Sequence, residues 1–373
     1  MKAKRVLITG GAGFVGSHTA DALLAAGHEV RIFDNLTPQV HKAGRSTHLP
    51  SGAEFVLGDM RNRSQVDKAV QNIDVIFHLA AVVGVGQSMY QISDYTATNN
   101  LGTANLFQAV LDTRSQPEKI VVASSMSIYG EGKYWCAKCG EVAPSARPLN
   151  QMKRKQWEPV CPNCRQALLP VPTREDKQLE CTSIYALSKK DQEEMTLLFG
   201  RTYGIPAVAL RYFNIYGTRQ SLSNPYTGVG AIFASRLMNG KSPIIFEDGR
   251  QMRDFVSVHD IAKANLLAME KSGADGKAVN IGSGHPVTIS EVAAELERAL
   301  AVKLPPQITG KYRAGDIRHC FADISTATQL LGYRPETRLK EGIEELVEWL
   351  ESQQASDDVD EAMERLNAHG LVA

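Results

Sequence analysis

The sequence predicts an α/β protein whose core is an open, doubly wound parallel sheet. Short runs rich in β-branched residues alternate with amphipathic stretches over the first 210 residues, which is typical of parallel strands joined by helical crossovers. The run 5–9 leads directly into a glycine-rich turn, residues 10–16, and an amphipathic stretch follows to about residue 26. Strand, glycine-rich turn and helix in this order indicate a nucleotide-binding unit.

Composition excludes several classes of protein. The 373 residues, 43% of them hydrophobic, can bury the cores of two domains. The 41 basic and 41 acidic side chains leave no net charge to attract nucleic acid or an anionic membrane. No apolar stretch is long enough to span a bilayer, and the one after the basic N-terminus is too short for a signal peptide. We expect a cytoplasmic protein without nucleic-acid or membrane partners.

The first βα unit has the features that a dinucleotide needs. Gly10 permits the tight turn, Gly13 lets the backbone approach a pyrophosphate, and Gly16 lets the helix pack on the strand. The amides at the helix start, next to the pyrophosphate, are electropositive. The following strand, 28–33, ends at Asp34, a carboxylate for the ribose hydroxyls, which favours NAD over NADP.

Three more strands are expected, at 54–58, 75–81 and 119–123, with a polar surface loop at 37–53 and a helix over 91–113. The carboxyl ends of such strands bind the ligand. His78, inside the second of these strands, is interpreted as structural. The residues expected to contact the cofactor are Gly10, Gly13, Phe14, Val15, Gly16, Asp34, Asn35, Asp59, Met60, Leu79, Ala80, Ala81, Asn100, Tyr185 and Lys189.

Tyr185 and Lys189 are the candidate catalytic pair. Residues four apart lie on one face of a helix, where an ammonium can lower the pKa of a phenol from its reference of about 10. A phenol adjusted in this way can shuttle a proton during interconversion of an alcohol and a ketone. Taken alone, the spacing also fits an exposed helical pair. Ser125, at the end of the strand 119–123, completes the candidate catalytic set.

Several motifs occur in one order: the glycine-rich turn, Asp34, Asp59, the serines at 124–125, Tyr185 with Lys189, 211–214, 253–254 and 313–316. In this the chain resembles the extended short-chain dehydrogenases/reductases, specifically the nucleotide-sugar epimerases and dehydratases, over about residues 4–350. The resemblance implies bound, recycled NAD, a nucleoside-diphosphate sugar and a homodimer formed through 91–113 and 184–203. The candidate substrate-binding residues are Ser125, Ser127, Asn214, Phe246, Arg253, Arg313 and Asp316.

The predicted organisation has two interleaved domains. An NAD-binding Rossmann domain spans 1–210 and includes an insert at 131–180, a sugar-nucleotide domain spans mainly 211–350, and a polar, loosely helical tail spans 351–373. The insert contains two Cys-x-x-Cys pairs, which are the candidate metal ligands Cys136, Cys139, Cys161 and Cys164. Four thiolates at this spacing predict a closed, structural zinc site; a labile redox dithiol is the alternative. We expect Cys181 and Cys320 to be ordinary buried thiols. Because the insert follows the serine at the strand end, we hypothesise that it covers part of the sugar site.

The residues after Ser125 indicate the reaction. In the dehydratases that the chain resembles, an Asp-Glu pair follows the catalytic hydroxyl, whereas here Met126 and Ser127 do. Neither can serve as general acid or base, so NAD-dependent 4-epimerisation by transient oxidation at C4 is expected. The substrate type resembled most is a dTDP-6-deoxyhexose such as dTDP-L-rhamnose; UDP-glucose, UDP-N-acetylhexosamine and UDP-glucuronate are alternatives. A 4-keto-sugar reductase using NAD(P)H and a non-catalytic NAD-sensing regulator also remain open.

Overall fold

A seven-stranded parallel sheet forms the centre of the protein. The computed structural model describes residues 2–41, 48–222, 224, 226, 228–313, 315–353 and 359–372. The strand order is β13-β9-β5-β4-β1-β2-β3, so the order reverses between β1 and β4. Ligands bind at such a reversal in doubly wound sheets. The strands are β1 (Arg5–Thr9), β2 (Glu29–Asp34), β3 (Glu54–Leu57), β4 (Val75–His78), β5 (Lys119–Ser125), β9 (Ala207–Tyr212) and β13 (Lys277–Ile281).

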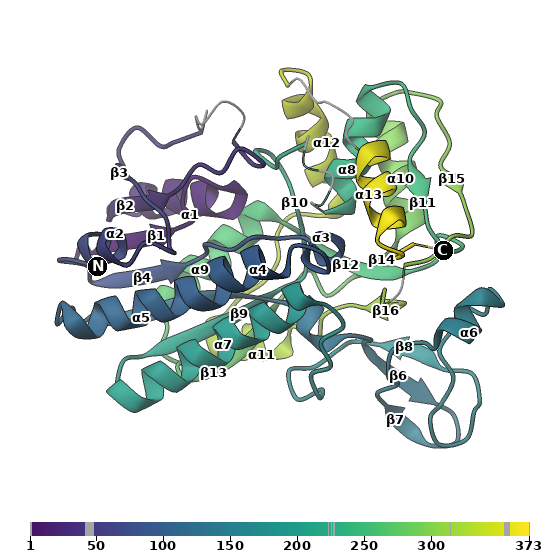
Figure 1. The fold of residues 1–373 in the computed structure, drawn as a ribbon, viewed down its shortest axis with the longest axis horizontal. Helices are drawn as coiled ribbons and strands as arrows, with labels where there is room; N and C mark the ends of the chain where they lie inside the picture. Colours follow the sequence, from purple (N-terminus) through teal and green to yellow (C-terminus); the bar gives the residue numbers. More distant parts are fainter. Residues whose placement is uncertain are drawn as a thin grey trace.

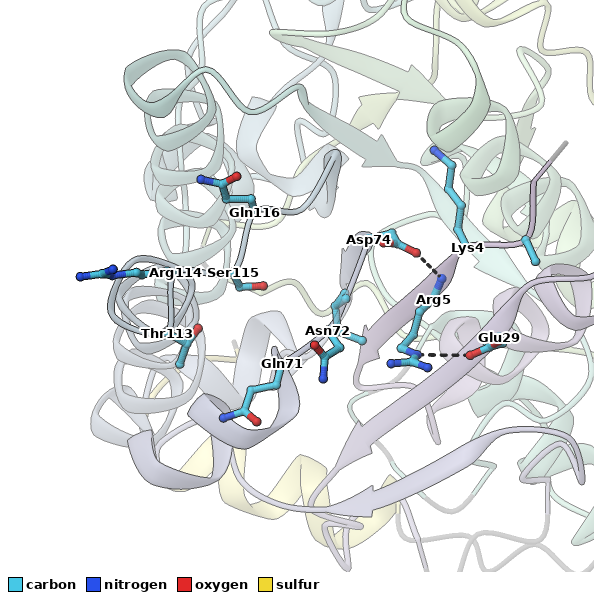
Figure 2. A pocket seen from close by; sticks show the side chains of 12 residues that line it. Lys4, Arg5, Glu29, Gln71, Asn72, Asp74, Thr113, Arg114, Ser115 and Gln116 are labelled. Atoms are coloured by element: carbon cyan, nitrogen blue, oxygen red, sulfur yellow. Dashed lines mark hydrogen bonds and ion pairs between the residues drawn. The ribbon is translucent and has the colours of Figure 1, made fainter.

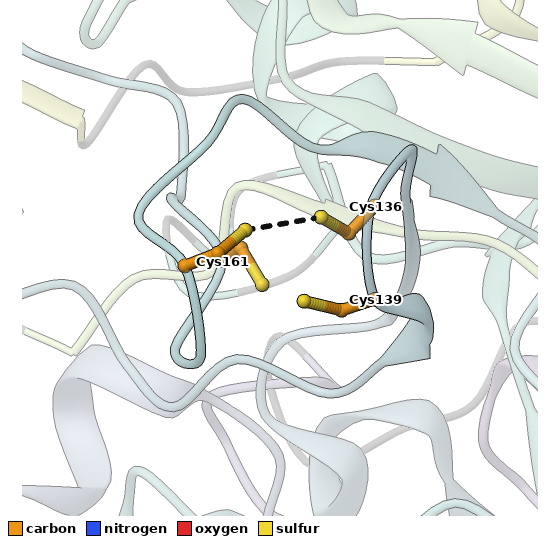
Figure 3. A group of neighbouring side chains, drawn as sticks. Cys136, Cys139 and Cys161 are labelled. Atoms are coloured by element: carbon orange, nitrogen blue, oxygen red, sulfur yellow. Dashed lines mark hydrogen bonds between the residues drawn. The ribbon is translucent and has the colours of Figure 1, made fainter.

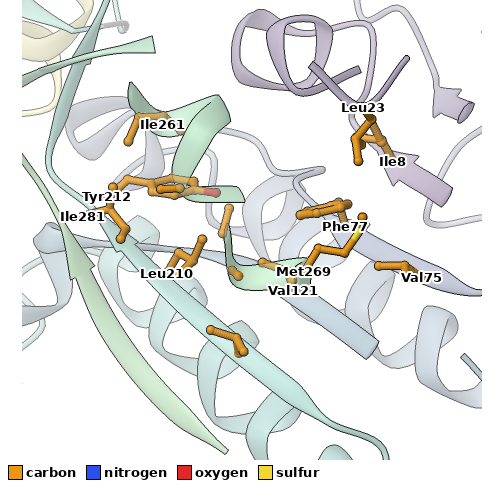
Figure 4. Close-up of a cluster of buried hydrophobic side chains, with 14 of the residues drawn as sticks. Ile8, Leu23, Val75, Phe77, Val121, Leu210, Tyr212, Ile261, Met269 and Ile281 are labelled. Carbon is orange, nitrogen blue, oxygen red and sulfur yellow. The ribbon is translucent and has the colours of Figure 1, made fainter. Parts of the chain in front are cut away.

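Helices cover both faces of this sheet (Figure 1). One face packs against α1 (Phe14–Ala25), α9 (Val258–Glu270) and α11 (Ser325–Leu331), and the other against α2 (Arg63–Ala69), α5 (Gly102–Asp112) and α7 (Ile184–Tyr203). Along β1, Val6 and Ile8 enter the first core while Leu7 enters the second. Figure 4 shows Ile8 and Phe77 opposite Leu23 in the first of these cores. Because both faces are covered, the strands are continuously apolar.

The predicted helix over 91–113 is divided in the structure. It begins with α4 (Ile92–Tyr95), widens into a π-helical stretch, η2 (Thr96–Leu101), and continues as α5; a short α3 (Val85–Ser88) precedes it. A π-helical stretch adds a residue to the turn and so rotates the side chains that follow, often at functional sites. Asn99 and Asn100 lie within this stretch.

The second half of the chain builds smaller sheets beside the large one. One joins β10 (Asn214–Tyr216), β12 (Met252–Ser257), β14 (Pro286–Thr288) and β16 (His319–Cys320), and a second pairs β11 (Ile244–Ile245) with β15 (Gln307–Ile308). A separate core packs α8 (Val229–Met238), α10 (Ile289–Ala299) and α12 (Leu339–Leu350) together. Because β13 from this half completes the large sheet, the two halves are interleaved.

The insert forms a small antiparallel unit that projects away from the large sheet (Figure 1). Its strands are β6 (Lys133–Cys136), β7 (Gly140–Val142) and β8 (Leu169–Val171), ordered β7-β6-β8, and it also contains α6 (Leu149–Lys153). A one-turn 3-10 helix, η3 (Met126–Tyr129), joins β5 to it. Of the two thiols outside the cysteine pairs, Cys320 is buried, whereas Cys181 is only partly so.

The described part of the predicted polar tail is more ordered than expected. It forms α13 (Val359–Ala368), in which Ala362 and Leu366 are buried, and Asp360 pairs with Arg236 at 3.0 Å and Lys241 at 3.1 Å. The predicted helix is therefore present in these residues, but it is not loose, because the apolar side chains on one of its faces are buried. Residues 354–358 and 373 of that tail, and 42–47 of the predicted surface loop, lie outside the described residues. Among the helices that the structure describes, none is long and apolar enough to cross a membrane.

Candidate active site

One cavity of about 890 Å³ lies at the carboxyl ends of the parallel strands. It extends from the glycine-rich turn to the smaller sheets of the second half and to α13. Of the predicted cofactor, substrate and catalytic residues, these line it: Gly10, Gly13, Phe14, Val15, Gly16, Asp34, Asn35, Asp59, Met60, Leu79, Ala80, Ala81, Ser125, Ser127, Tyr185, Lys189, Asn214, Phe246, Arg253, Arg313 and Asp316.

A second hollow, of about 730 Å³, opens at the amino ends of the same strands (Figure 2). Polar residues line it, and several of them already bind one another: the Arg5 backbone amide donates to Asp74 at 2.7 Å, and the Arg5 guanidinium pairs with Glu29 at 3.2 Å. The candidate site is therefore the cavity at the carboxyl ends, which contains the chemically active side chains.

The glycine-rich turn leaves room for a phosphate at the start of α1. Gly10 has φ +72°, and a Cβ there would come within 2.8 Å of the Ala80 backbone. A Cβ at Gly16 would come within 2.3 Å of the carbonyl oxygen of Gly10, so helix and strand require glycine for close packing. The N-cap, Gly13, offers no side-chain hydrogen bond to the first amides of the helix. These amides face the cavity and fit a dinucleotide pyrophosphate.

Two carboxylates mark the ends of the neighbouring strands. Asp34 accepts hydrogen bonds from the amides of Ala12 at 3.1 Å and Leu36 at 2.9 Å, which fixes its side chain at the cavity edge. Hydrogen bonds from Arg61 lower the pKa of Asp59 to about 2, so this carboxylate is ionised at neutral pH. The pair fits the ribose and base of an adenine nucleotide, as the fingerprint predicts.

Asn100 is the one predicted cofactor contact that does not line the cavity. Its side-chain amide donates to Asp191 on α7. The adjacent Asn99 takes the position facing the cavity wall: its amide oxygen accepts from the Val82 amide at 2.8 Å and its nitrogen donates to the Val82 carbonyl at 3.1 Å. Neither asparagine lines the cavity, so the placement of Asn100 departs from the prediction of a cofactor contact, whereas Asn99 holds the Val82 backbone that does line it.

Ser125 and Tyr185 meet in the middle of the cavity. Ser125 ends β5, and Tyr185 lies in the first turn of α7, whose N-cap Ser183 accepts from the Ala186 amide at 3.1 Å. The amide and the hydroxyl of Ser127 donate to the Ser125 Oγ at 3.2 and 2.9 Å. With its oxygen accepting these bonds, Ser125 has its own proton left to donate to a substrate oxygen or to Tyr185.

The electrostatics of Tyr185 differ from the simple prediction. Burial raises the pKa of Tyr185, and a hydrogen bond with Ser125 acts in the opposite direction. Burial also lowers the pKa of Lys189 to about 7, against the charge of Glu193. The expectation that Lys189 alone makes the phenol acidic neglected this desolvation, which disfavours the charged form of both groups.

Gln192, one helical turn beyond Lys189, was not among the predicted site residues. Its side-chain oxygen accepts from the Lys189 ammonium at 2.7 Å, and its nitrogen donates to Thr103 at 2.9 Å. The same nitrogen lies 3.1 Å from His78, whose other ring nitrogen lies 2.8 Å from the Thr9 hydroxyl. Burial lowers the pKa of His78 to about 3, so it is a neutral, structural residue as expected. The i, i+3 spacing of Gln192 from Lys189 was the available signal.

The far end of the cavity gathers the predicted substrate residues. The Arg313 guanidinium lies 4.8 Å from the centre of the Phe246 ring, and Arg253 and Arg313 pair with Asp316 at 3.8 and 3.5 Å. The side-chain oxygen of Asn214 is buried without a hydrogen-bond partner, which fits a ligand donor. A ring, two guanidinium groups and a carboxylate match a base, a diphosphate and a ribose.

The sequence pattern of the NAD dependent epimerase/dehydratase family matches residues 6–151 and 164–282. The chain belongs to this family. The break between the two matched segments, residues 152–163, falls inside the insert, and residues 283–373 also lie outside the match.

Relatives agree over nearly the whole chain. The dTDP-L-rhamnose 4-epimerase of Burkholderia thailandensis is 34% identical over 352 residues, 93% of this chain and 95% of that protein. A UDP-N-acetylglucosamine 4-epimerase structure from Methanobrevibacter ruminantium has a TM-score of 0.76 at 30% identity, covering 95% of this chain and 100% of that one. A Thermus thermophilus UDP-glucose 4-epimerase complex with NAD has a TM-score of 0.74 at 29% identity, covering 94% and 100%.

The positions of the insert and of α13 relative to the cavity differ from what the sequence predicted. Among the described residues that line the cavity, none comes from 131–180, so the structure gives no support to the idea that the insert roofs the sugar site. Instead α13 lines the cavity with Ala362, Met363 and Leu366, and α8 contributes Arg236. The apolar residues at 362, 363 and 366 were the available signal for α13.

The four paired cysteines converge within the insert. Figure 3 shows Cys136, Cys139 and Cys161 with their sulfurs directed toward one another. With Cys164, all four sulfurs lie within 4.8 Å of one another, and Cys136 and Cys164 are 3.5 Å apart. Four thiolates at this separation fit the tetrahedral coordination of a structural metal ion.

Proposed function

We propose that the protein is an NAD-dependent 4-epimerase of a nucleoside-diphosphate hexose. The observation that carries the proposal is that Ser125, Tyr185 and Lys189 lie in one cavity with the glycine-rich turn and the arginine pair. The carboxylates lining the described part of that cavity are Asp34, Asp59, Asp94 and Asp316. They belong to the cofactor side or to the arginine pair, so the second acid and base that dehydration needs are not supplied beside Ser125.

The proposed mechanism uses these three side chains and a fixed diphosphate. Tyr185, as the phenolate, accepts the proton of the 4-hydroxyl, and Ser125 donates a hydrogen bond to the same oxygen. The Lys189 ammonium stabilises the phenolate before this transfer, against the burial that raises the pKa of Tyr185. Bound NAD supplies the chemistry of accepting a hydride from C4 and returning it. Arg253 and Arg313 would hold the diphosphate while the sugar ring turns to present its other face, and Tyr185 would return the proton to the oxygen at C4.

We propose a dTDP-6-deoxyhexose such as dTDP-L-rhamnose as substrate. The similarity to the Burkholderia protein supports this choice, and so does the apolar residue beside the catalytic serine, Met126, which suits a methyl group better than a charged one. UDP-glucose, UDP-N-acetylhexosamine and UDP-glucuronate remain the alternatives to be tested beside it.

We further propose zinc in the cysteine cluster and a homodimer. Zinc is the ion that four thiolates most often hold in a closed structural site, and the small core of the insert needs such support. For the dimer, the support is a set of exposed apolar side chains on the two predicted interface helices: Ile92, Leu101, Leu187 and Leu198. Metal analysis of the purified protein and light scattering after size exclusion test the two statements separately.

Proton NMR tests the reaction itself. Purified protein without added NAD is incubated separately with dTDP-L-rhamnose and with each UDP-hexose, and Tyr185→Phe serves as the inactive control. Appearance of the C4 epimer from one of them establishes the reaction and the nucleotide together. Turnover only of a 4-keto sugar, and only with added NADH or NADPH, would replace the epimerase by a reductase. No turnover of any sugar by a protein that retains NAD would favour a regulator.

A further inference from the structure

We propose that Arg147 is a positioning residue for the nucleotide-binding end of the cavity, held in place by the metal-binding cysteines. Arg147 and Glu158 both belong to the segment between the two cysteine pairs, residues 140–160, which we call the cysteine-bounded loop. The proposal rests on the proposed binding of a nucleoside-diphosphate sugar. It gives the insert a role in substrate binding although no described insert residue lines the cavity.

Arg147 is the first support that the loop provides. Its side chain is 1% exposed and donates to the Glu247 carboxylate at 2.8 Å and to the Asp316 carbonyl at 2.9 Å. It also donates to the Trp157 carbonyl at 3.0 Å, which joins two parts of the loop. One guanidinium therefore fixes two separate segments of the second half relative to the insert.

Glu158 is the second support. Its carboxylate accepts from the Arg318 guanidinium at 2.5 and 2.9 Å and lies 2.9 Å from the His319 ring. Arg318 is fully buried and donates in turn to Glu247 at 2.9 Å. Arg147 and Arg318 thus meet on the same carboxylate, which makes the two supports one connected network.

This network lies directly behind the residues proposed to hold the nucleotide. Glu247 follows Phe246 in the chain, and Asp316 provides both the carbonyl that Arg147 binds and the carboxylate that pairs with Arg253 and Arg313. The Arg253 guanidinium donates to the carbonyls of residues 317 and 318 at 2.7 and 2.9 Å. A shift of the cysteine-bounded loop would displace the base platform and the diphosphate arginines together.

The loop has few apolar anchors besides this network: Met152 is buried, and the Trp157 ring lies 6.3 Å from that of Tyr312. The buried apolar cluster of the insert consists of Tyr134, Cys136, Cys161 and Leu168, two of which are metal-ligand candidates. Closing the loop through a metal removes much of the conformational entropy that would otherwise oppose its docking. Buried ion pairs stabilise only when their geometry is kept, so the network depends on this closure. Metal loss should therefore weaken nucleotide binding without altering the chemistry at Tyr185.

The test compares Arg147→Lys with Arg154→Lys in the full-length, NAD-containing protein. Lysine keeps the charge of Arg147 but has a single nitrogen, so it cannot join the Trp157 carbonyl to Glu247 and Asp316 as the two guanidinium nitrogens do. Arg154, in contrast, is an exposed arginine of the same loop that donates to Gln156. Calorimetric binding of dTDP and of UDP, kcat and KM are measured for each. We expect the Kd of the bound nucleotide and the KM to rise about tenfold for Arg147→Lys with kcat within about twofold, and no change for Arg154→Lys.

Two further measurements make the outcome decisive. Removing metal from the wild-type protein with a chelator should raise the same Kd while NAD content stays constant, and readdition of zinc should reverse it. If Arg147→Lys fails to retain NAD, Glu158→Gln replaces it with the same expectation. An unchanged nucleotide Kd in the variant and after metal removal would overturn the proposal. Failure of the wild-type protein to bind either nucleotide would instead refute the proposed function, and the two failures are thereby distinguished.

Discussion

Gln192 provides a sharp test of how the site sets the charge of Lys189. The Gln192 oxygen accepts from the buried Lys189 ammonium at 2.7 Å, and Gln192→Met keeps the volume but removes that acceptor. A hydrogen bond to a charged group contributes about 1.5–3 kcal/mol, and 1.4 kcal/mol corresponds to a tenfold change in a protonation equilibrium. The substitution should therefore lower the pKa of Lys189 from about 7 to roughly 5 or 6.

The expected consequence is a shift in the pH profile of kcat/KM. At pH 7 the protonated fraction of Lys189 would fall from about one half to about a tenth or a hundredth, so activity falls about five- to fiftyfold and recovers toward acidic pH. Gln192→Glu, which adds a carboxylate, should move the profile the other way. Thr103→Val removes one partner of the Gln192 nitrogen but keeps the oxygen that accepts from Lys189, so it should leave the profile in place. Parallel wild-type and Gln192→Met profiles would refute this account of Lys189.

Three other predictions use independent parts of the structure. Tyr185→Phe should reduce turnover by about 10²- to 10⁴-fold while NAD remains bound, measured by NMR of the sugar and by the nucleotide released on denaturation; turnover near that of the wild type would contradict the assignment. Removing residues 359–373 should raise the KM more than it lowers kcat. The reason is that α13 lines the cavity, whereas the candidate catalytic residues Ser125, Tyr185 and Lys189 belong to other segments. An unchanged KM would exclude a role for α13 in substrate binding. In the folded protein the pKa of His78 is about 3, below its unfolded value of 6.5, so the folded state binds the proton more weakly than the unfolded state does. The free energy of unfolding should therefore fall as the pH drops from 6.5 to 3, by about 5 kcal/mol at most from this group. Urea unfolding of His78→Gln should show a flatter dependence over that range, and equal slopes would contradict it.

The periodicity and spacing of residues close together in the sequence were enough to predict the strands and the turn that surround the site. The alternation of Val6, Leu7 and Ile8 between two cores follows from the two-residue period of a strand, and the turn at Gly10 follows from its need for positive φ. The four-residue spacing of Tyr185 and Lys189 puts both on one face of α7. The four cysteines were found from their spacing alone, since two short chelating pairs need only one loop to bring them together.

The remaining features depend on contacts that no local pattern contains. The prediction placed Asn100 at the cofactor, whereas its side chain, within the π-helical stretch, donates to Asp191 on α7. It also gave the phenol of Tyr185 too much acidity, because desolvation depends on what covers the ring. The sequence by itself therefore determined the family and predicted the cofactor fingerprint and the candidate catalytic side chains, because these follow from residues close together in the chain. Only the tertiary structure decided which groups are buried, that α13 lines the cavity and that Arg147 reaches Glu247 and Asp316, because these contacts join segments far apart in sequence.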